Sequence, residues 1–222
     1  MLMTPRRKPT LAEQHTALAH QFDDLAQQHE ASSLGMWAFL LTEIMFFGGL
    51  FAGYTVYRTA YAAGFVAGSQ HLDILLGTLN TAVLISSSLT MALSVHAAQV
   101  GQRQLLTGFL LLTMLLGLVF LSIKGYEYWH KYHESLVPGV RFNYTGPYPR
   151  QVQLFLIFYF VMTGLHALHM VIGLGLLAIL AVLAWRGWFS AVYSTPVEII
   201  GLYWHFVDIV WIFLYPLLYL LG

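Results

Sequence analysis

Five apolar stretches, each long enough to cross a lipid bilayer, constrain the fold of this 222-residue chain more than any other feature. A helix needs about 20 apolar residues to span about 30 Å of hydrocarbon. The stretches run approximately over Leu34–Tyr57, Leu72–Ala97, Leu105–Tyr128, Leu154–Trp185 and Val197–Leu220. None alternates as a β-strand would, and in lipid only helices and closed barrels satisfy their backbone polar groups. The sequence therefore predicts an all-α membrane protein, a bundle of five transmembrane helices.

The composition is typical of a membrane protein. Hydrophobic residues make up 58% of the sequence and charged residues 9%, whereas a soluble domain carries about 25% charged residues. The sequence has no cysteine, which excludes disulfides and thiolate metal sites. Its formal net charge is zero, so nothing in the charge favours nucleic acid as a partner.

Residues 1–33 differ from the rest, and we expect them to form a tail that precedes a membrane domain of residues 34–222. The tail begins with a basic cluster, and Thr10 to Glu13 fits a helix-capping box. Apolar residues then follow at helical spacing: Leu11, Leu18, Phe22 and Leu25. This pattern favours an N-terminal amphipathic tail that lies on the membrane surface or on a partner. A frayed tail is the alternative.

Ionisable side chains inside the apolar stretches are the candidate functional residues. Each costs about 2.5 kcal/mol or more at the bilayer centre, so it persists only where protein or water satisfies it. In the last stretch, Glu198, His205 and Asp208 recur at helical spacing and form one stripe, which needs a partner surface. In the first stretch, Glu43 lies about 13 Å inside at 1.5 Å per residue. We interpret Glu43 as a proton-relay or lipid-contact residue, with a structural hydrogen bond between helices as the alternative.

The membrane histidines raise the question of a metal or a haem. His166 and His169 are spaced i, i+3 on one helical face, but a zinc site needs three or four ligands. Hydrogen bonding is therefore the preferred interpretation, and neither a metal site nor a catalytic residue is expected. Two alternatives stay open: a haem held between histidines such as His166 and His205 on facing helices, and a proton or solute transporter built on the intramembrane carboxylates.

Other polar residues are interpreted as structural. Asn80 and two serines of the second stretch, spaced seven apart, indicate a polar seam between helices. Glu127 and Lys131, spaced i, i+4, predict an ion pair at a helix end that emerges into solvent beside a belt of aromatic residues. Glu198, near the start of the last stretch, is assigned to the same structural group.

Three sequence words occur in an order typical of one membrane family. Gly35 to Phe47 is similar to a Gly-Met-x-x-Phe-x-x-x-Glu-x-Met-Phe-Phe helix. Thr163 to His169 matches Thr-Gly-x-His-x-x-His, and Tyr203 to Trp211 matches the closing helix Tyr-Trp-His-Phe-Val-Asp-x-Val-Trp. Together the words resemble the subunit III family of the haem–copper oxidases, and the resemblance covers about residues 34–220.

The resemblance implies cytochrome c oxidase subunit III, a non-catalytic, cofactor-free subunit of a respiratory oxidoreductase that reduces oxygen and moves protons. Haem and copper would belong to its partner, the catalytic subunit I, and phospholipid would occupy a cleft in this chain. By resemblance, lipid binding and support of proton uptake fall to Glu43, His166, His169, His205 and Asp208.

The resemblance also implies a bacterial inner membrane protein with a cytoplasmic N-terminus and a periplasmic C-terminus. The basic residues are divided equally between the two sides, so they do not decide the orientation. The longer form of the family has seven spans where this chain has five, and the two missing helices would form one wall of the lipid cleft. A short form also occurs in quinol oxidases and beside nitric oxide reductases, so the electron donor is left open.

Overall fold

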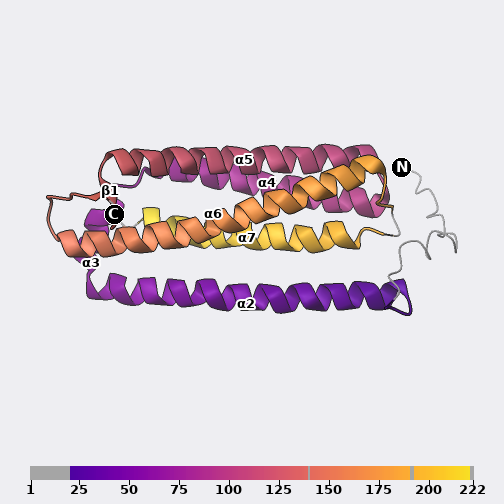
Figure 1. Cartoon of the computed structure of the whole chain (residues 1–222), viewed down its shortest axis with the longest axis horizontal. Coiled ribbons are helices and arrows are strands. Elements are labelled where there is room, and N and C mark those ends of the chain that lie inside the picture. Colours follow the sequence, from indigo (N-terminus) through magenta and orange to yellow (C-terminus); the bar gives the residue numbers. More distant parts are fainter. Residues whose placement is uncertain (1–20, 140, 191–192, 221–222) are drawn as a thin grey trace.

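The structure, a computed structural model, describes residues 21–139, 141–190 and 193–220 of the chain. Its elements are α2 (Leu25–Ala60), α3 (Ala62–Ser69), α4 (Ile74–Val100), α5 (Arg103–His133), β1 (Leu136–Val137), β2 (Arg141–Phe142), α6 (Pro149–Arg186) and α7 (Thr195–Tyr219). The five long helices α2, α4, α5, α6 and α7 are each long and apolar enough to cross a membrane. The predicted helical membrane bundle is thereby confirmed (Figure 1).

The first span is longer than its apolar stretch. α2 begins at Leu25 rather than Leu34, because the side chain of Asp24 caps it and accepts a hydrogen bond from the backbone N–H of Gln27 at 2.7 Å. Polar residues continue this helix beyond the apolar part, where hydropathy does not reveal it. The predicted capping box and the apolar positions Leu11 and Leu18 lie outside the described residues.

Two short elements were missed by the sequence analysis. Helix α3 connects α2 to α4, and the loop after α5 contains a two-stranded antiparallel hairpin in which Leu136 pairs with Phe142. Gly139, at a φ of +83°, supplies the left-handed conformation in this hairpin. Both elements are too short to leave a periodic signal in the sequence.

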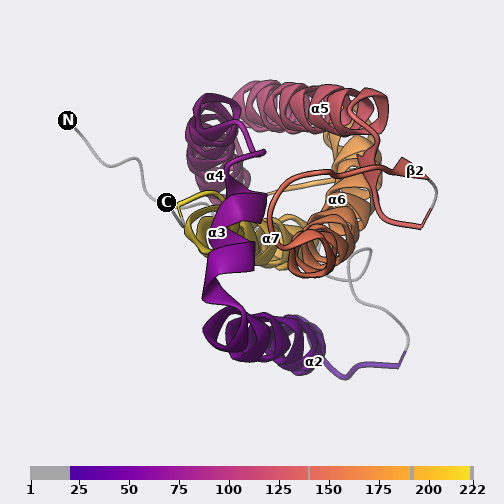
Figure 2. The same ribbon diagram turned by 90° about the vertical axis from the view of Figure 1, so that its left-hand side faces the viewer.

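Helices α4 to α7 group together, and α2 lies to one side of them, as the end-on view in Figure 2 shows. α4 packs on both α5 and α7, and α6 also packs on both α5 and α7, so the four helices form a closed ring of neighbours. α2 contacts mainly α7 and touches α6 less. In the most apolar 18-residue part of α2, 11% of the residues are buried. The corresponding share in α7 is 56%.

Close packing within the four-helix group centres on Trp204 of α7, whose side chain is completely buried. Gly117 of α5 and Gly173 of α6 leave room for its indole ring. A Cβ atom at Gly173 would lie 3.0 Å from the ring, and one at Gly117 would lie 2.9 Å from it. These glycines let three helices approach one large side chain.

Candidate functional site

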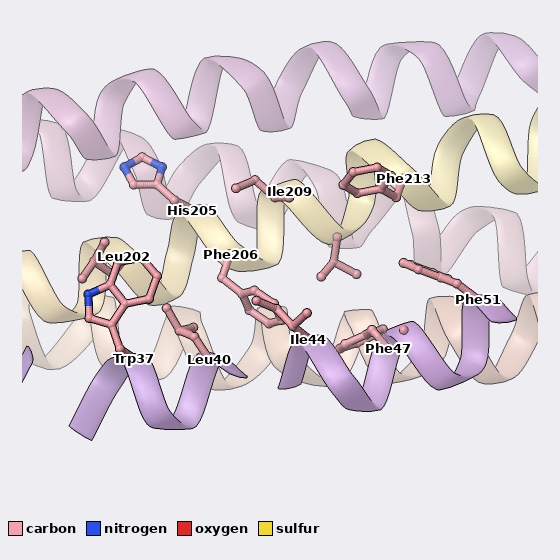
Figure 3. A pocket seen from close by; sticks show the side chains of 12 residues that line it. Trp37, Leu40, Ile44, Phe47, Phe51, Leu202, His205, Phe206, Ile209 and Phe213 are labelled. Carbon is pink, nitrogen blue, oxygen red and sulfur yellow. The ribbon is translucent and has the colours of Figure 1, made fainter. Parts of the chain in front are cut away.

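A groove of about 380 Å³ separates the middle of α2 from α7 (Figure 3). Aromatic and aliphatic side chains of both helices face it. The lining residues are Trp37, Leu40, Ile44, Phe47, Gly48 and Phe51 of α2, and Leu202, His205, Phe206, Ile209, Val210 and Phe213 of α7. An apolar groove at this depth suits an acyl chain rather than a polar ligand.

A pair of ionisable residues joins α2 to α6 near this groove. Nε2 of His169 lies 3.1 Å from Oε2 of Glu43, and the two side chains are only 13% and 20% exposed. The other ring nitrogen of His169, Nδ1, lies 2.9 Å from the carbonyl oxygen of Leu165. Phe47, which lines the groove, packs edge-on against the His169 ring.

The hydrogen bonds of this pair fix where one proton lies. A carbonyl oxygen only accepts, so Nδ1 of His169 must carry a hydrogen and donate it to Leu165. Nε2 then either donates a second proton to a charged Glu43 or accepts one from a neutral Glu43. In both cases a single proton lies between the two side chains. The pair can therefore store and exchange a proton, or simply hold α2 in place.

Two further contacts hold α2 against α7 at its ends. The hydroxyl of Tyr54, which is completely buried, donates to the carbonyl oxygen of Leu217 at 2.7 Å. That carbonyl belongs to the last turn of α7, where backbone acceptors lack intrahelical donors. At the opposite end, Nδ1 of His29 lies 3.2 Å from the hydroxyl of Thr195.

His166 does not join His169 in a common site. Its ring is buried between Phe120 and Trp211, and its Nε2 lies 3.1 Å from the carbonyl oxygen of Val207. His169, on the same helix α6, instead faces Glu43 of α2. Among the described residues, no three histidine or carboxylate side chains come close enough together to hold a metal ion.

The polar stripe of the last span faces α4. Helix α4 is therefore the partner surface that the spacing of this stripe predicts. Glu198 accepts hydrogen bonds from Gln99 and Ser194. Further along, three side-chain hydrogen bonds join the two helices: Trp204 to Ser87 (3.0 Å), His205 to Ser88 (2.7 Å) and Trp211 to Thr81 (3.1 Å). Asn80, Ser87 and Ser94 of the predicted seam are completely buried in the bundle, and the Asn80 side-chain amide has no hydrogen-bond partner among the described residues.

The expectation that Glu127 lies at a solvated helix end is wrong. Lys124 and Glu127 are both 3% exposed and form an ion pair of 2.8 Å inside the bundle. Lys131 pairs with Glu134 instead of Glu127. The helix turns these three residues inward, while Tyr126 on the other face of α5 is exposed, as expected for an interfacial belt.

Two tyrosines complete this ion pair, and neither of them could be identified from the spacing of residues within one helix. The Lys124 ammonium donates to the hydroxyls of Tyr159 (3.1 Å) and Tyr219 (2.8 Å), and Tyr219 donates to both oxygens of Glu127. The ammonium also lies 4.9 to 5.5 Å from four ring centroids, including that of Trp211. A buried charge pair of this kind is stable only with such additional hydrogen bonds.

The fold and these contacts define a multi-pass helical membrane protein in which ionisable side chains pair across helices beside an apolar groove. The family model of cytochrome c oxidase subunit III matches residues 19–222. The chain is 38% identical to cytochrome c oxidase subunit 3 of Synechocystis sp. over 84% of this chain and 74% of that protein. It is 35% identical to cytochrome c oxidase subunit 3 of Thermostichus vulcanus over 96% and 97% of the two chains.

Quinol oxidase subunits are also among the relatives. The probable quinol oxidase subunit 3 of Staphylococcus haemolyticus is 31% identical over 90% of this chain and 94% of its own length. The chain belongs to the cytochrome c oxidase subunit III family. It is thus a subunit III of the haem–copper oxidases, a part of an oxidoreductase complex.

Proposed function

We propose that this chain is a cofactor-free accessory subunit of a respiratory haem–copper terminal oxidase in a bacterial inner membrane. It packs beside the catalytic subunit I, which carries the haem and copper, and it contributes stability, phospholipid binding and support of proton uptake. Its N-terminus is cytoplasmic and its C-terminus periplasmic. It has no active site of its own.

The observation that best supports an accessory role is the state of the three membrane histidines. Each already has a hydrogen-bond partner within the chain: His166 the Val207 carbonyl, His169 the Glu43 carboxyl and His205 the Ser88 hydroxyl. A haem held between two imidazoles needs their nitrogens directed at one iron. The His166 ring is enclosed between Phe120 and Trp211 inside the bundle, whereas His205 lines the groove between α2 and α7, so the two rings lie in different surroundings.

The α2/α7 groove supports the lipid-binding part of the proposal. Its lining is apolar, it lies between helices that cross the membrane, and the Glu43–His169 pair lies next to it. A lipid acyl chain in the groove would contact α2 and α7 together. It would thereby stabilise the helix that the rest of the chain holds least tightly.

The first test is purification of the intact complex in mild detergent through a tag on this chain. Partner masses and the reduced-minus-oxidised spectrum are then recorded, and haem is measured on this chain after dissociation. Co-purification of a large haem–copper subunit, with no haem left on this chain, is the expected result. A chain that came out alone and coloured would instead indicate a cytochrome. A colourless single chain that conducts ions in liposomes would indicate a transporter.

The same purification identifies the electron donor. A relative named as a quinol oxidase subunit and one named as a cytochrome c oxidase subunit both align with this chain over nearly their whole lengths. Oxidation of reduced cytochrome c or of a quinol by the purified complex assigns the branch. We propose cytochrome c, in agreement with the family model and with the relatives of higher identity.

A further inference from the structure

Tyr203 of α7 is buried where α7 meets the two helices that carry the Glu43–His169 pair. The residue is 4% exposed. The centroid of its ring lies 6.1 Å from that of Phe39 of α2 and 6.5 Å from that of His169 of α6. The rings of Tyr203 and His169 are inclined by only 26°, so they lie in an offset stack. Tyr203 is therefore a direct neighbour of the imidazole that bonds Glu43.

The hydroxyl of Tyr203 holds this ring at one residue of α6. It donates a hydrogen bond of 3.0 Å to the backbone carbonyl oxygen of His169, the same residue whose imidazole the ring faces. A carbonyl oxygen accepts a hydrogen bond but has no proton to pass on. The bond is thus suited to fixing the tyrosine in place rather than to relaying a proton.

The orientation of the His169 imidazole matters because both of its nitrogens are used. Nδ1 is bonded to the Leu165 carbonyl and Nε2 to Glu43. A half-turn of the ring would place carbon atoms where the two nitrogens lie, so both hydrogen bonds would be lost together. Tyr203, stacked near the ring, and Phe47, edge-on at 5.4 Å, leave the ring less space for other orientations.

Other titratable side chains on the same helices have partners elsewhere. His166 of α6 is bonded to a backbone carbonyl of α7. On α7, His205 and the buried Asp208 both face Ser88 of α4. Tyr203, which interacts electrostatically with the carboxyl group of the pair, is the titratable neighbour that α7 brings to it.

We propose that Tyr203 is the positioning residue of the Glu43–His169 pair, holding the imidazole so that Nε2 stays directed at the carboxyl group. This inference rests on the proposed function, because it concerns how the pair supports proton uptake. The proton moves between Glu43 and His169, and Tyr203 itself carries none. Through Tyr203, the packed group α4–α7 controls the geometry of a pair that it shares with α2.

The dependence of oxidase turnover on pH, measured on the purified intact complex, tests this role. Tyr203→Leu removes ring and hydroxyl, and Tyr203→Phe removes the hydroxyl alone. Each is made in the wild type and together with Glu43→Gln. Tyr215→Phe is the matched control, because it removes another interhelical contact of an α7 tyrosine, in which the hydroxyls of Tyr215 and Thr78 are 2.6 Å apart. Tyr215 lies about 18 Å along α7 from Tyr203 at 1.5 Å per residue.

Tyr203→Leu should lower turnover at alkaline pH to the same extent as Glu43→Gln. Tyr203→Phe should lower it less, by up to about threefold, the average effect of one hydrogen bond between membrane helices. In the Glu43→Gln variant, neither substitution should lower the alkaline turnover further, because residues that act through one pair are not additive. Tyr215→Phe should keep the wild-type pH profile.

A wild-type pH profile in both Tyr203 variants, while that of Glu43→Gln is altered, would overturn the inference and leave the proposed function intact. Losses that add to that of Glu43→Gln, or an equal loss in Tyr215→Phe, would also overturn it, because they indicate a general packing effect. If Glu43→Gln itself kept the wild-type profile, the proposed support of proton uptake would fail, and the inference with it. Tyr203→Phe, which is nearly isosteric, decides these outcomes if Tyr203→Leu does not assemble.

Discussion

Helices α2 and α7 both cross the membrane, but they are held in place differently. α7 packs between α4 and α6, and its side chains reach α5 across the core, with Trp204 and Trp211 completely buried and hydrogen-bonded to α4. α2 has neighbours on one side only, and few hydrogen bonds such as Glu43–His169 and Tyr54–Leu217 attach it. Stability in this fold is therefore concentrated in α4–α7, whereas α2 can be displaced at lower cost.

The packed group α4–α7 and the contact of α2 also differ in the ionisable pairs that they contain. Lys124 and Glu127 are enclosed in the four-helix group with two tyrosine hydroxyls, and they contribute to how these helices fit together. Glu43 and His169 are partly exposed beside a groove and share one proton. The first pair is suited to structure, and the second is suited to exchange with a proton donor or a lipid.

The largest effect is expected from Glu127→Gln. The amide keeps an acceptor for Tyr219 but leaves the buried Lys124 ammonium without a counter-charge. Removing one partner of a buried pair costs about 3–5 kcal/mol. We expect a loss of that size in the free energy of unfolding, measured by SDS titration of the purified chain in detergent micelles.

Two variants provide controls for this prediction. Glu30→Gln, on an exposed part of α2, should leave the free energy of unfolding unchanged. The double variant Lys124→Gln and Glu127→Gln should be more stable than Glu127→Gln alone, because it removes the unpaired charge. Additive losses from the two substitutions would show that the pair is not coupled.

A smaller loss, about 1–3 kcal/mol, is expected from Gly173→Val. Its new side chain would collide with the Trp204 indole, which has no room to move. Gly175→Val, on the same helix with no atom within 4 Å, and Gly49→Val on α2, equally open, should be nearly neutral. The same unfolding titration measures all three. Equal losses at the three positions would contradict the contrast between the packed group and α2.

Tyr54→Phe is expected to cost about 0.5–1.5 kcal/mol, because it removes one hydrogen bond and leaves the Leu217 carbonyl without its donor. The loss should be local to α2. Limited proteolysis near the α2–α3 junction should accelerate, while the unfolding of α4–α7 stays as in the wild type. Faster cleavage throughout the chain would mean that α2 is an integral part of the packed group.

The smallest effect on stability is expected from Glu43→Gln, within about 1 kcal/mol, because the amide is nearly isosteric and can still donate to His169. Assembly with the partner subunits should be intact. Since an amide does not exchange a proton, we expect slower turnover of the complex and faster loss of activity at alkaline pH. Wild-type turnover across the pH range would make Glu43 a packing residue.

The sequence predicted the parts of the fold that depend on lipid contact. Apolar length gave the five spans, and helical spacing placed the Glu198–Asp208 stripe on one face, which packs on α4. The cost of burying ionisable groups also predicted that Glu43 and His169 need partners. That the two are each other's partners depends on how α2 lies against α6, which spacing within one helix does not encode.

The error at Glu127 has a physical cause. A lysine, a glutamate and several aromatic residues near a helix end have the composition of a membrane interface, whether the charges face water or the protein interior. The tyrosines that stabilise the inward arrangement come from α6 and α7, far away in the sequence. The start of α2 at Leu25 was missed for a related reason. A capping side chain, and not hydropathy, determines where this helix begins.

Distances between spin labels on engineered cysteines test whether α4–α7 form a fixed group to which α2 is attached by few contacts. The chain has no cysteine of its own, so labelling is specific. One label at Val171 of α6 is paired either with Leu115 of α5 or with Leu41 of α2, all exposed. We expect a narrow α5–α6 distance distribution and a broader α2–α6 distribution that widens further in Tyr54→Phe, which removes the hydrogen bond from α2 to the Leu217 carbonyl. Equally narrow distributions, both unchanged by that substitution, would contradict this arrangement.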